Sequence, residues 1–209
     1  AYGMEVFYHC LRWCVGAQPP DIEAWITEAM TRYPTIKDWD VLNEGYGENA
    51  PTSSVDVVEI YRCARRARPD ARLWYNGAFV NAYEREQVLT LVKLGLVDGI
   101  GIQFHLTIYS DLTERLKAIN EIETLGVWWR VSELDVRLYL PPSTEDLAKQ
   151  ADLYSLVSYI CHNSRTCTDV TVWGAADQYS WVPGTYDGWG LATPFDRYYL
   201  PKVFWEAVK

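Results

Sequence analysis

No stretch of this sequence approaches the roughly 20 consecutive apolar residues that a helix needs to cross a bilayer. Low-complexity runs, internal repeats and linkers are absent as well, and no charged-then-apolar leader opens the chain. A chain of 209 residues without such breaks fits one domain with a sizeable core. We therefore expect a single domain over residues 1–209, no membrane partner, and removal of any secretion signal before residue 1.

Basic side chains are scarce relative to acidic ones. The 19 Lys and Arg residues stand against 28 Asp and Glu residues, which gives a net charge of −9. A protein that binds a polyanion needs a basic face to displace the counterions of the phosphates. In addition, no glycine-rich phosphate loop follows any predicted strand. We therefore expect no nucleic-acid partner, and nucleotide binding is disfavoured.

Metal-binding patterns are missing too. The five cysteines are Cys10, Cys14, Cys63, Cys161 and Cys167, and no His/Cys group has the spacing of a zinc site. An odd number leaves at least one thiol unpaired unless two chains are cross-linked. Cys161 and Cys167 flank the short polar turn HNSRT, and a disulfide there would indicate an oxidising compartment.

Aromatic side chains, in contrast, are abundant. The chain has 10 Trp and 15 Tyr residues. Such side chains commonly fill a core, and about half of them are expected to do so here. The others are candidates for flat platforms on which the apolar faces of sugar rings stack. Composition leaves both interpretations open.

Short β-rich runs alternate with helical segments along the whole chain. Six runs are predicted as strands: Glu5–His9, Lys37–Asn43, Arg72–Asn76, Gly99–Gln103, Val127–Glu133 and Val170–Trp173. Helix signals lie between these runs. Pro19 and Pro20 precede a helix through Tyr33, and Ser53 and Ser54 precede a helix that reaches Ala67. Asp111 precedes a helix that ends near Gly126, a capping-box spacing at Ser143 and Asp146 precedes the helix Glu145–Cys161, and Pro201 precedes a last helix.

Regular alternation of this kind predicts parallel strands connected by crossover helices. The fold is then an α/β structure, either a closed barrel or an open doubly wound sheet. In a TIM (β/α)₈ barrel the active site lies at the carboxyl ends of the strands, which is where this sequence places its polar and aromatic residues. The count reaches about six β/α units, however, where a closed barrel has eight.

Two glutamates differ from the other acidic residues. Most acids lie on polar helix faces, as in the runs EREQ and EDLAKQ, and are expected to be solvated. Glu44 and Glu133 instead close the apolar strands KDWDVLNE and WWRVSE. Cleavage of a glycoside needs two carboxyl groups on either side of one bond, one protonated and one ionised. We therefore interpret Glu44 and Glu133 as a catalytic pair, although a glutamate at a strand end can also form a simple ion pair.

Other polar and aromatic side chains fall at the same predicted strand ends. Asn43 can hydrogen-bond a sugar hydroxyl beside Glu44, or simply cap its strand. An imidazole next to a carboxylate can fix its rotamer and its charge, which makes the two histidines at this rim candidates rather than ordinary structural histidines. The candidate set comprises His9, Trp13, Asn43, His105, Trp173 and Trp181.

At these residues the chain resembles glycoside hydrolase family 10, the xylanase family built on a (β/α)₈ barrel. The segment WDVLNE is similar to the acid/base motif of the family, and SELDV is similar to its nucleophile motif. GIGIQFHL resembles the sixth-strand motif, which adds Gln103 to His105. VWGAADQYSWVPG resembles the eighth-strand segment with Trp173 and Trp181, and HCLRW resembles the third-strand motif with His9 and Trp13.

The chain also departs from the family pattern. The segment after the fifth family strand reads NGAF in place of an NDYN-type sequence, which leaves a sugar-binding role for Asn76 open. Counted against the family, the strands match the third to the eighth, so the first two β/α units and their sugar-binding residues are missing. The resemblance thus implies a truncated barrel with an open edge, either monomeric or weakly self-associating through that edge.

The resemblance implies a retaining endo-β-1,4-xylanase that needs no cofactor and no metal. Glu133 is then the nucleophile, Glu44 the general acid/base, and xylan the polysaccharide substrate. It also implies a disulfide between Cys161 and Cys167, which is common in fungal members, and secretion to the extracellular space. Two alternatives remain: a related β-glycosidase that acts on another β-1,4-glycan, and a catalytically weak, truncated xylan-binding protein.

Overall fold

The computed structural model describes residues 3–13, 19–45 and 57–208. The chain divides into two compact units. Unit 1 comprises Ala1–Gly101 and Lys117–Trp129, and unit 2 comprises Ile102–Leu116 and Arg130–Lys209. The single domain over residues 1–209 stays a prediction.

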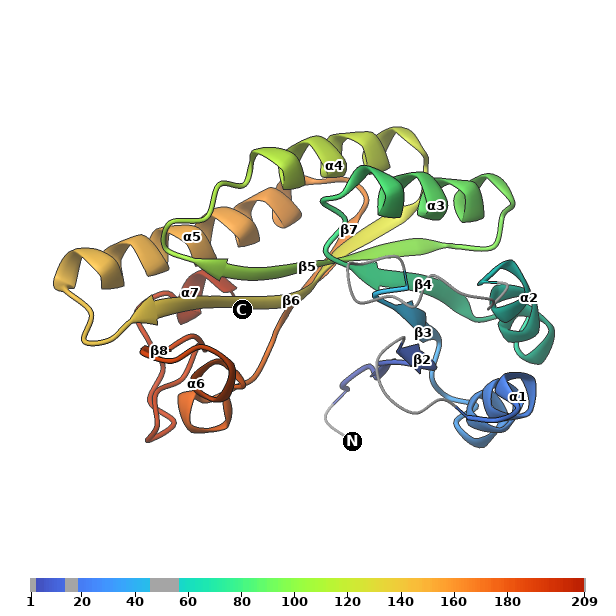
Figure 1. Cartoon of the computed structure of the whole chain (residues 1–209), viewed down its shortest axis with the longest axis horizontal. Coiled ribbons are helices and arrows are strands. Elements are labelled where there is room, and N and C mark those ends of the chain that lie inside the picture. Colours follow the sequence, from blue (N-terminus) through green and yellow to red (C-terminus); the bar gives the residue numbers. More distant parts are fainter. Residues whose placement is uncertain (1–2, 14–18, 46–56, 209) are drawn as a thin grey trace. The chain divides into compact units, whose positions relative to one another are not determined.

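Six strands of the described residues follow one another across a sheet in the order β1, β3, β4, β5, β6, β7 (Figure 1). β1 and β2 both pair in parallel with β3, and β3 pairs in parallel with β4. Helices separate the strands along the chain. The predicted α/β fold is therefore confirmed as a fragment of a (β/α)-barrel, whose strand order runs from β1 at one end to β7 at the other.

Unit 1 holds the first strands and helices. Its elements are β1 (Phe7–Tyr8), β2 (Arg12–Trp13), α1 (Ile22–Arg32), β3 (Asp38–Asn43), α2 (Val57–Ala67), β4 (Arg72–Gly77) and α3 (Ala82–Lys93), followed by the start of β5 (Gly99–Thr107). All six residues of β3 are buried, as expected for a parallel strand that is covered on both faces. Helices α1 and α2 pack against each other.

Unit 2 holds the rest of the sheet. It contains most of β5, the first residues of α4 (Thr113–Thr124), most of β6 (Trp128–Tyr139), α5 (Thr144–Asn163), β7 (Cys167–Val172), a 3₁₀ turn at Asp177–Tyr179, α6 (Val182–Thr185), β8 (Trp189–Gly190) and α7 (Trp205–Val208). β8 pairs with β6 in the antiparallel direction. Helix α5 packs on β7 and α7, and the rings of Tyr154 and Phe204 stack with centroids 4.0 Å apart.

Several element boundaries differ from the predictions. β5 and β6 continue to Thr107 and Tyr139, past the polar residues at which the strands were expected to end. The predicted first strand is short, and a second short segment, β2, continues along the same partner strand. The last helix begins at Trp205 rather than at Pro201. The predicted caps Ser53 and Ser54 lie outside the described residues.

The capping box ahead of α5 is confirmed. The Ser143 hydroxyl accepts a hydrogen bond from the Asp146 N–H, and the Asp146 carboxylate accepts one from the Ser143 N–H. Both bonds satisfy N–H groups that a helix start leaves without partners. This local signal sets where the longest helix of the chain begins, immediately after β6.

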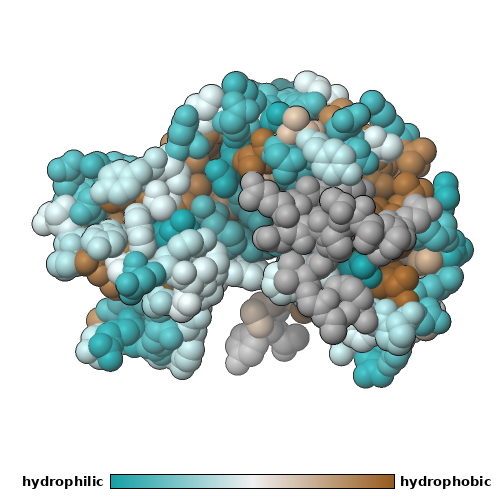
Figure 2. Space-filling model, viewed as in Figure 1, coloured by the Kyte–Doolittle hydropathy of each residue, from teal (hydrophilic) through white to brown (hydrophobic). Residues whose placement is uncertain are grey.

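The surface visible in Figure 2 is mostly hydrophilic, and apolar side chains come to it in separate patches. Among the described residues, no helix is long and apolar enough to cross a bilayer.

Candidate active site

Glu133 lies in the middle of β6, in unit 2, and is only 3% exposed. Two side chains from β5 hold its carboxylate. The Gln103 Nε2 group donates to Oε1 at 3.1 Å, and the Nε2 atom of His105 lies 2.9 Å from Oε2. Each oxygen therefore has its own partner, so the rotamer of this buried carboxylate is determined by two side chains of the neighbouring strand β5.

The second nitrogen of the His105 ring is also engaged. Nδ1 lies 2.9 Å from Oδ2 of Asp135, and the Trp181 indole N–H donates to the same oxygen at 2.7 Å. The Trp181 ring meets His105 edge-on, with centroids 4.9 Å apart, and Trp173 does so at 6.1 Å. The imidazole is thus bonded at both nitrogens and walled by two indoles.

These contacts decide the charge of His105. Burial disfavours the charged ring, but the hydrogen bonds and negative charges of Asp135 and Glu133 outweigh it and raise the pKa of His105 to about 9. The ring is then a cation at neutral pH. Only the cationic imidazole can donate from both nitrogens at once, which matches its two carboxylate partners.

Asp135 was not predicted as a site residue. It is fully buried and forms the link between His105 and Trp181. Alternate residues of a strand point to the same face. The pairs Gln103/His105 and Glu133/Asp135 both have this two-residue spacing. The strand periodicity therefore indicates that Asp135 lies on the same face of β6 as Glu133.

Glu44 follows the last residue of β3, in unit 1. Its backbone is in the left-handed region, with φ at 54°, and its N–H donates to the carbonyl of Asn76 at 2.8 Å. The Trp13 indole N–H donates to Oε2 of Glu44 at 3.0 Å. A left-handed backbone is strained for a residue with a side chain, and such strain is typical of functional positions.

The neighbours of Glu44 in unit 1 form two further pairs. The Asn76 amide donates to the side-chain oxygen of Asn43 at 2.8 Å, across the ends of β4 and β3. Nδ1 of His9 lies 2.9 Å from Oδ2 of the buried Asp40. Asp40 was not predicted, although it shares the WDVLNE segment with Glu44. Within unit 1 the structure thus brings Trp13 to Glu44, Asn43 to Asn76 and His9 to Asp40.

One acidic run contradicts the expectation of a solvated helix face. Glu84, the first residue of EREQ, is only 2% exposed. The Tyr75 hydroxyl donates to its Oε1 atom at 2.7 Å. Burial is the main cause of the raised pKa of Glu84, opposed by that hydrogen bond. Helical periodicity placed this glutamate on a helix, but the burial comes from β4, which packs under the first turn of α3.

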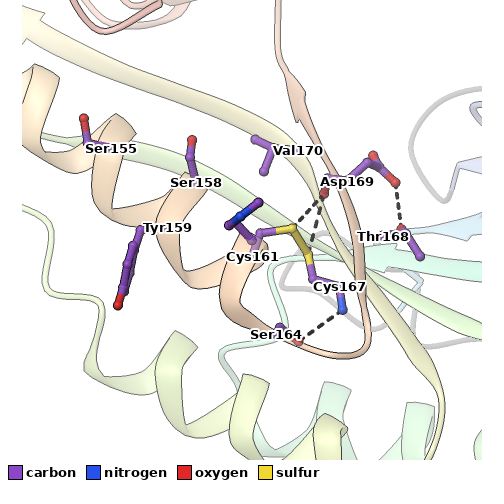
Figure 3. A pocket seen from close by; sticks show the side chains of 10 residues that line it. Ser155, Ser158, Tyr159, Cys161, Ser164, Cys167, Thr168, Asp169 and Val170 are labelled. Atoms are coloured by element: carbon purple, nitrogen blue, oxygen red, sulfur yellow. Dashed lines mark hydrogen bonds between the residues drawn. A yellow bond between two sulfur atoms is a disulfide. The ribbon is translucent and has the colours of Figure 1, made fainter. Parts of the chain in front are cut away.

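The Cys161–Cys167 disulfide is present, and it joins the end of α5 to the start of β7 (Figure 3). A cavity of about 520 Å³ opens beside it. Hydroxyl-bearing side chains such as Ser155, Ser158 and Tyr159 line this cavity, and none of the candidate sugar-binding residues does. Cys14 lies outside the described residues.

Within the part of the chain that the structure describes, no group of three or more His, Cys, Asp or Glu side chains is placed to hold a metal ion.

Comparison with known proteins points to one family. Residues 15–209 match the sequence profile of "Glycosyl hydrolase family 10". A curated relative, endo-1,4-β-xylanase C of Phanerodontia chrysosporium, is 35% identical over 188 residues, which cover 81% of this chain and 47% of the relative. The chain spans about half the length of the curated relatives that it matches.

Two solved structures extend the likeness to the fold. Native xylanase 10B from Thermotoga maritima superposes with a TM-score of 0.87 at 28% identity, covering 98% of this chain and 73% of that chain. Xylanase 10B from Thermotoga petrophila RKU-1, in complex with xylobiose, gives a TM-score of 0.87 at 27% identity, covering 98% and 72%.

Proposed function

Because this chain belongs to glycosyl hydrolase family 10, we propose that it is a retaining endo-β-1,4-xylanase with Glu133 as nucleophile and Glu44 as general acid/base. The observation that carries the proposal is the setting of Glu133. A buried carboxylate held by Gln103 and by a cationic His105 is fixed in one rotamer and lies next to a compensating positive charge. A nucleophile in a double-displacement mechanism needs both properties.

In the first step Glu133 attacks the anomeric carbon of a xylose unit. The bond from that carbon to the glycosidic oxygen breaks, and Glu44 gives its proton to the departing oxygen. The products are a glycosyl ester on Glu133 and a free sugar hydroxyl. His105 stays protonated throughout and stabilises the negative charge of the pocket while Glu133 loses its own charge.

In the second step a water molecule attacks the same carbon from the side that the leaving group vacated. Glu44, now a carboxylate, takes a proton from this water, and the ester bond to Glu133 breaks. Two inversions give net retention. Both glutamates return to their starting protonation states, and no cofactor enters the reaction.

The remaining candidate residues bind sugar in this proposal. Amides and imidazoles suit hydroxyl groups, whereas indoles suit the apolar faces of sugar rings. Trp13 is 48% exposed and donates to Glu44, and in this proposal its ring packs against a sugar. The proposed binding set is His9, Trp13, Asn43, Gln103, His105, Trp173 and Trp181.

We also propose that the protein is secreted and extracellular. Support comes from the disulfide, since such bonds persist in oxidising compartments. The proposed partner is a xylan polysaccharide; complexes with xylobiose are known for relatives.

The test is hydrolysis of xylan by this 209-residue chain, with Glu133→Gln as the matched control. We expect release of short xylo-oligosaccharides by the unmodified chain and a loss of at least about 10³-fold in Glu133→Gln, because the covalent step is removed. Parallel assays with an aryl xyloside and an aryl glucoside distinguish a xylanase from a related glycosidase. Preferred cleavage of the glucoside would contradict the proposal.

One observation favours a second candidate function. The chain spans only about half the length of its curated relatives. The second candidate is a catalytically weak xylan-binding protein. Retention on a xylan affinity gel, together with a rate equal to that of Glu133→Gln, would favour binding over catalysis.

A further inference from the structure

We propose that Glu84 is a positioning residue for Glu44, because its buried carboxyl group organises the turn that directly follows Asn76, the β4 residue whose carbonyl accepts the Glu44 N–H. This inference rests on the proposed role of Glu44 as acid/base. Glu84 is 2% exposed and belongs to none of the motifs that the family resemblance singled out.

The first step is what the carboxyl group of Glu84 holds. It accepts hydrogen bonds from the Tyr75 hydroxyl at 2.7 Å and from the backbone N–H groups of Phe79 and Val80. Phe79 is fully buried with a left-handed backbone, at φ 56°. A bulky residue keeps this conformation only where its surroundings impose it. The three bonds to Glu84 supply that constraint.

The second step is the close fit around Gly77. A Cβ atom added at Gly77 would lie 2.2 Å from Oε1 of Glu84 and 2.9 Å from the Tyr75 ring. A side chain at this position would displace the carboxyl group, so Gly77 allows Glu84 to lie against the end of β4. The glycine at the end of β4 thus fits closely against the first turn of α3. The side-chain oxygen of Asn81, the N-cap of this helix, accepts a hydrogen bond from the Glu84 N–H at 2.6 Å.

The third step links this turn to Glu44. Asn76 stands directly before Gly77, and its carbonyl accepts the Glu44 N–H while its side-chain amide donates to Asn43. The strained backbone of Glu44 therefore depends on the position of Asn76. Because residues 77–80 follow Asn76 directly, a shift of this turn moves the Asn76 carbonyl and, with it, the acid/base Glu44. A negative charge on Glu44 also raises the pKa of Glu84, although burial is the largest cause of that shift.

The experiment compares Glu84→Ala, Glu84→Gln and Tyr75→Phe, with Glu86→Ala as the matched control on an exposed position of the same helix. The first readout is the rate with a poor leaving group, as in xylan, against the rate with an activated aryl xyloside. Loss of a general acid slows the poor leaving group more. We expect Glu84→Ala to lose about tenfold more activity on xylan than on the aryl substrate, and Glu84→Gln to recover most of it.

The second readout is independent of activity. Amide hydrogen exchange of Glu44 reports directly on its bond to Asn76, and we expect it to accelerate about tenfold in Glu84→Ala and in Tyr75→Phe, but not in Glu86→Ala. Equal losses on both substrates with unchanged Glu44 exchange would overturn the proposal. If the unmodified chain hydrolyses neither substrate, the proposed function fails and the exchange readout alone decides on Glu84. Should Glu84→Ala not fold, the comparison of Tyr75→Phe with Glu86→Ala decides.

Discussion

At the scale of single residues, the most informative feature is a charge that is buried and compensated. His105 lies between Glu133 and Asp135 and is bonded to both. Burying an ion is costly unless its partners are well placed, and removal of one partner leaves the others uncompensated. The ring therefore links the fold to the proposed chemistry, because the interactions that keep it charged also hold Glu133.

This linkage predicts how stability depends on pH. The pKa of His105 is raised to about 9 in the folded chain, above its ordinary value of 6.5. A raised pKa stabilises the fold fully below pH 6.5, and this contribution is lost as the pH rises through about 9. We define a stability difference as the unfolding free energy of the unmodified chain minus that of His105→Gln. We expect this difference to be larger at pH 6 than at pH 10, by up to about 3 kcal/mol.

Urea unfolding of both proteins between pH 6 and pH 10 measures this difference. His162→Gln, at an exposed position of α5, is the matched control and should show no such trend. A difference between the unmodified chain and His105→Gln that stays constant across this range would show that His105 is not charged in the folded state.

At the scale of elements, the longest helix depends on its first turn. The capping box of Ser143 and Asp146 satisfies two N–H groups at the start of α5, and α5 packs on β7 and α7. The helix also carries Gln150, whose amide donates to the carbonyls of Val136 and Leu191 in the interior of unit 2. The start of this helix therefore sets the register of several buried contacts.

We expect Ser143→Ala to lower the free energy of unfolding by about 1 kcal/mol, because the cap is lost while the rest of the helix is unchanged. Ser143→Thr retains the hydroxyl and should lose much less. Urea denaturation at constant pH measures both variants. A loss of equal size in the threonine variant would show that the hydroxyl bond is not the cause.

At the scale of the whole molecule, the proposed mechanism requires that both glutamates act on one substrate. We predict carboxyl groups about 5–5.5 Å apart, the separation of a retaining glycosidase. The measurable consequence is the configuration of the first-formed product. NMR during the first minutes of xylo-oligosaccharide hydrolysis should show the β-anomer before mutarotation. An α-anomer formed first, or a carboxyl separation near 9 Å in a crystal, would assign the chain to an inverting mechanism.

The strand order gives a second prediction at this scale. Among the described residues the order ends at β1 on one side and at β7 on the other, and the chain covers 73% of native xylanase 10B from Thermotoga maritima. Open sheet edges expose unpaired N–H and C=O groups and favour pairing between chains. We expect the 209-residue chain to self-associate weakly, seen as concentration-dependent sedimentation. A strict monomer at millimolar concentration would contradict this expectation.

The amino-acid sequence by itself predicted the alternation of strands and helices, the parallel α/β architecture, the start of α5 and, through short motifs, the resemblance to the family. These properties are local: strand and helix periods, capping residues and short motifs are all written along the chain. Glu44 directly follows β3, as the sequence predicted, whereas β6 continues past Glu133, which lies in the middle of that strand.

Only the tertiary structure decided what packs against each element. Periodicity assigned Glu84 to a solvated helix face, yet β4 covers it through Gly77 and Tyr75. Asp135 is a second example, because one of its hydrogen bonds comes from the indole N–H of Trp181, which is distant in the sequence. A sequence pattern specifies which face of an element a side chain occupies. Burial, charge and hydrogen-bond partners depend on residues far away in the chain, and these are determined only when the elements pack.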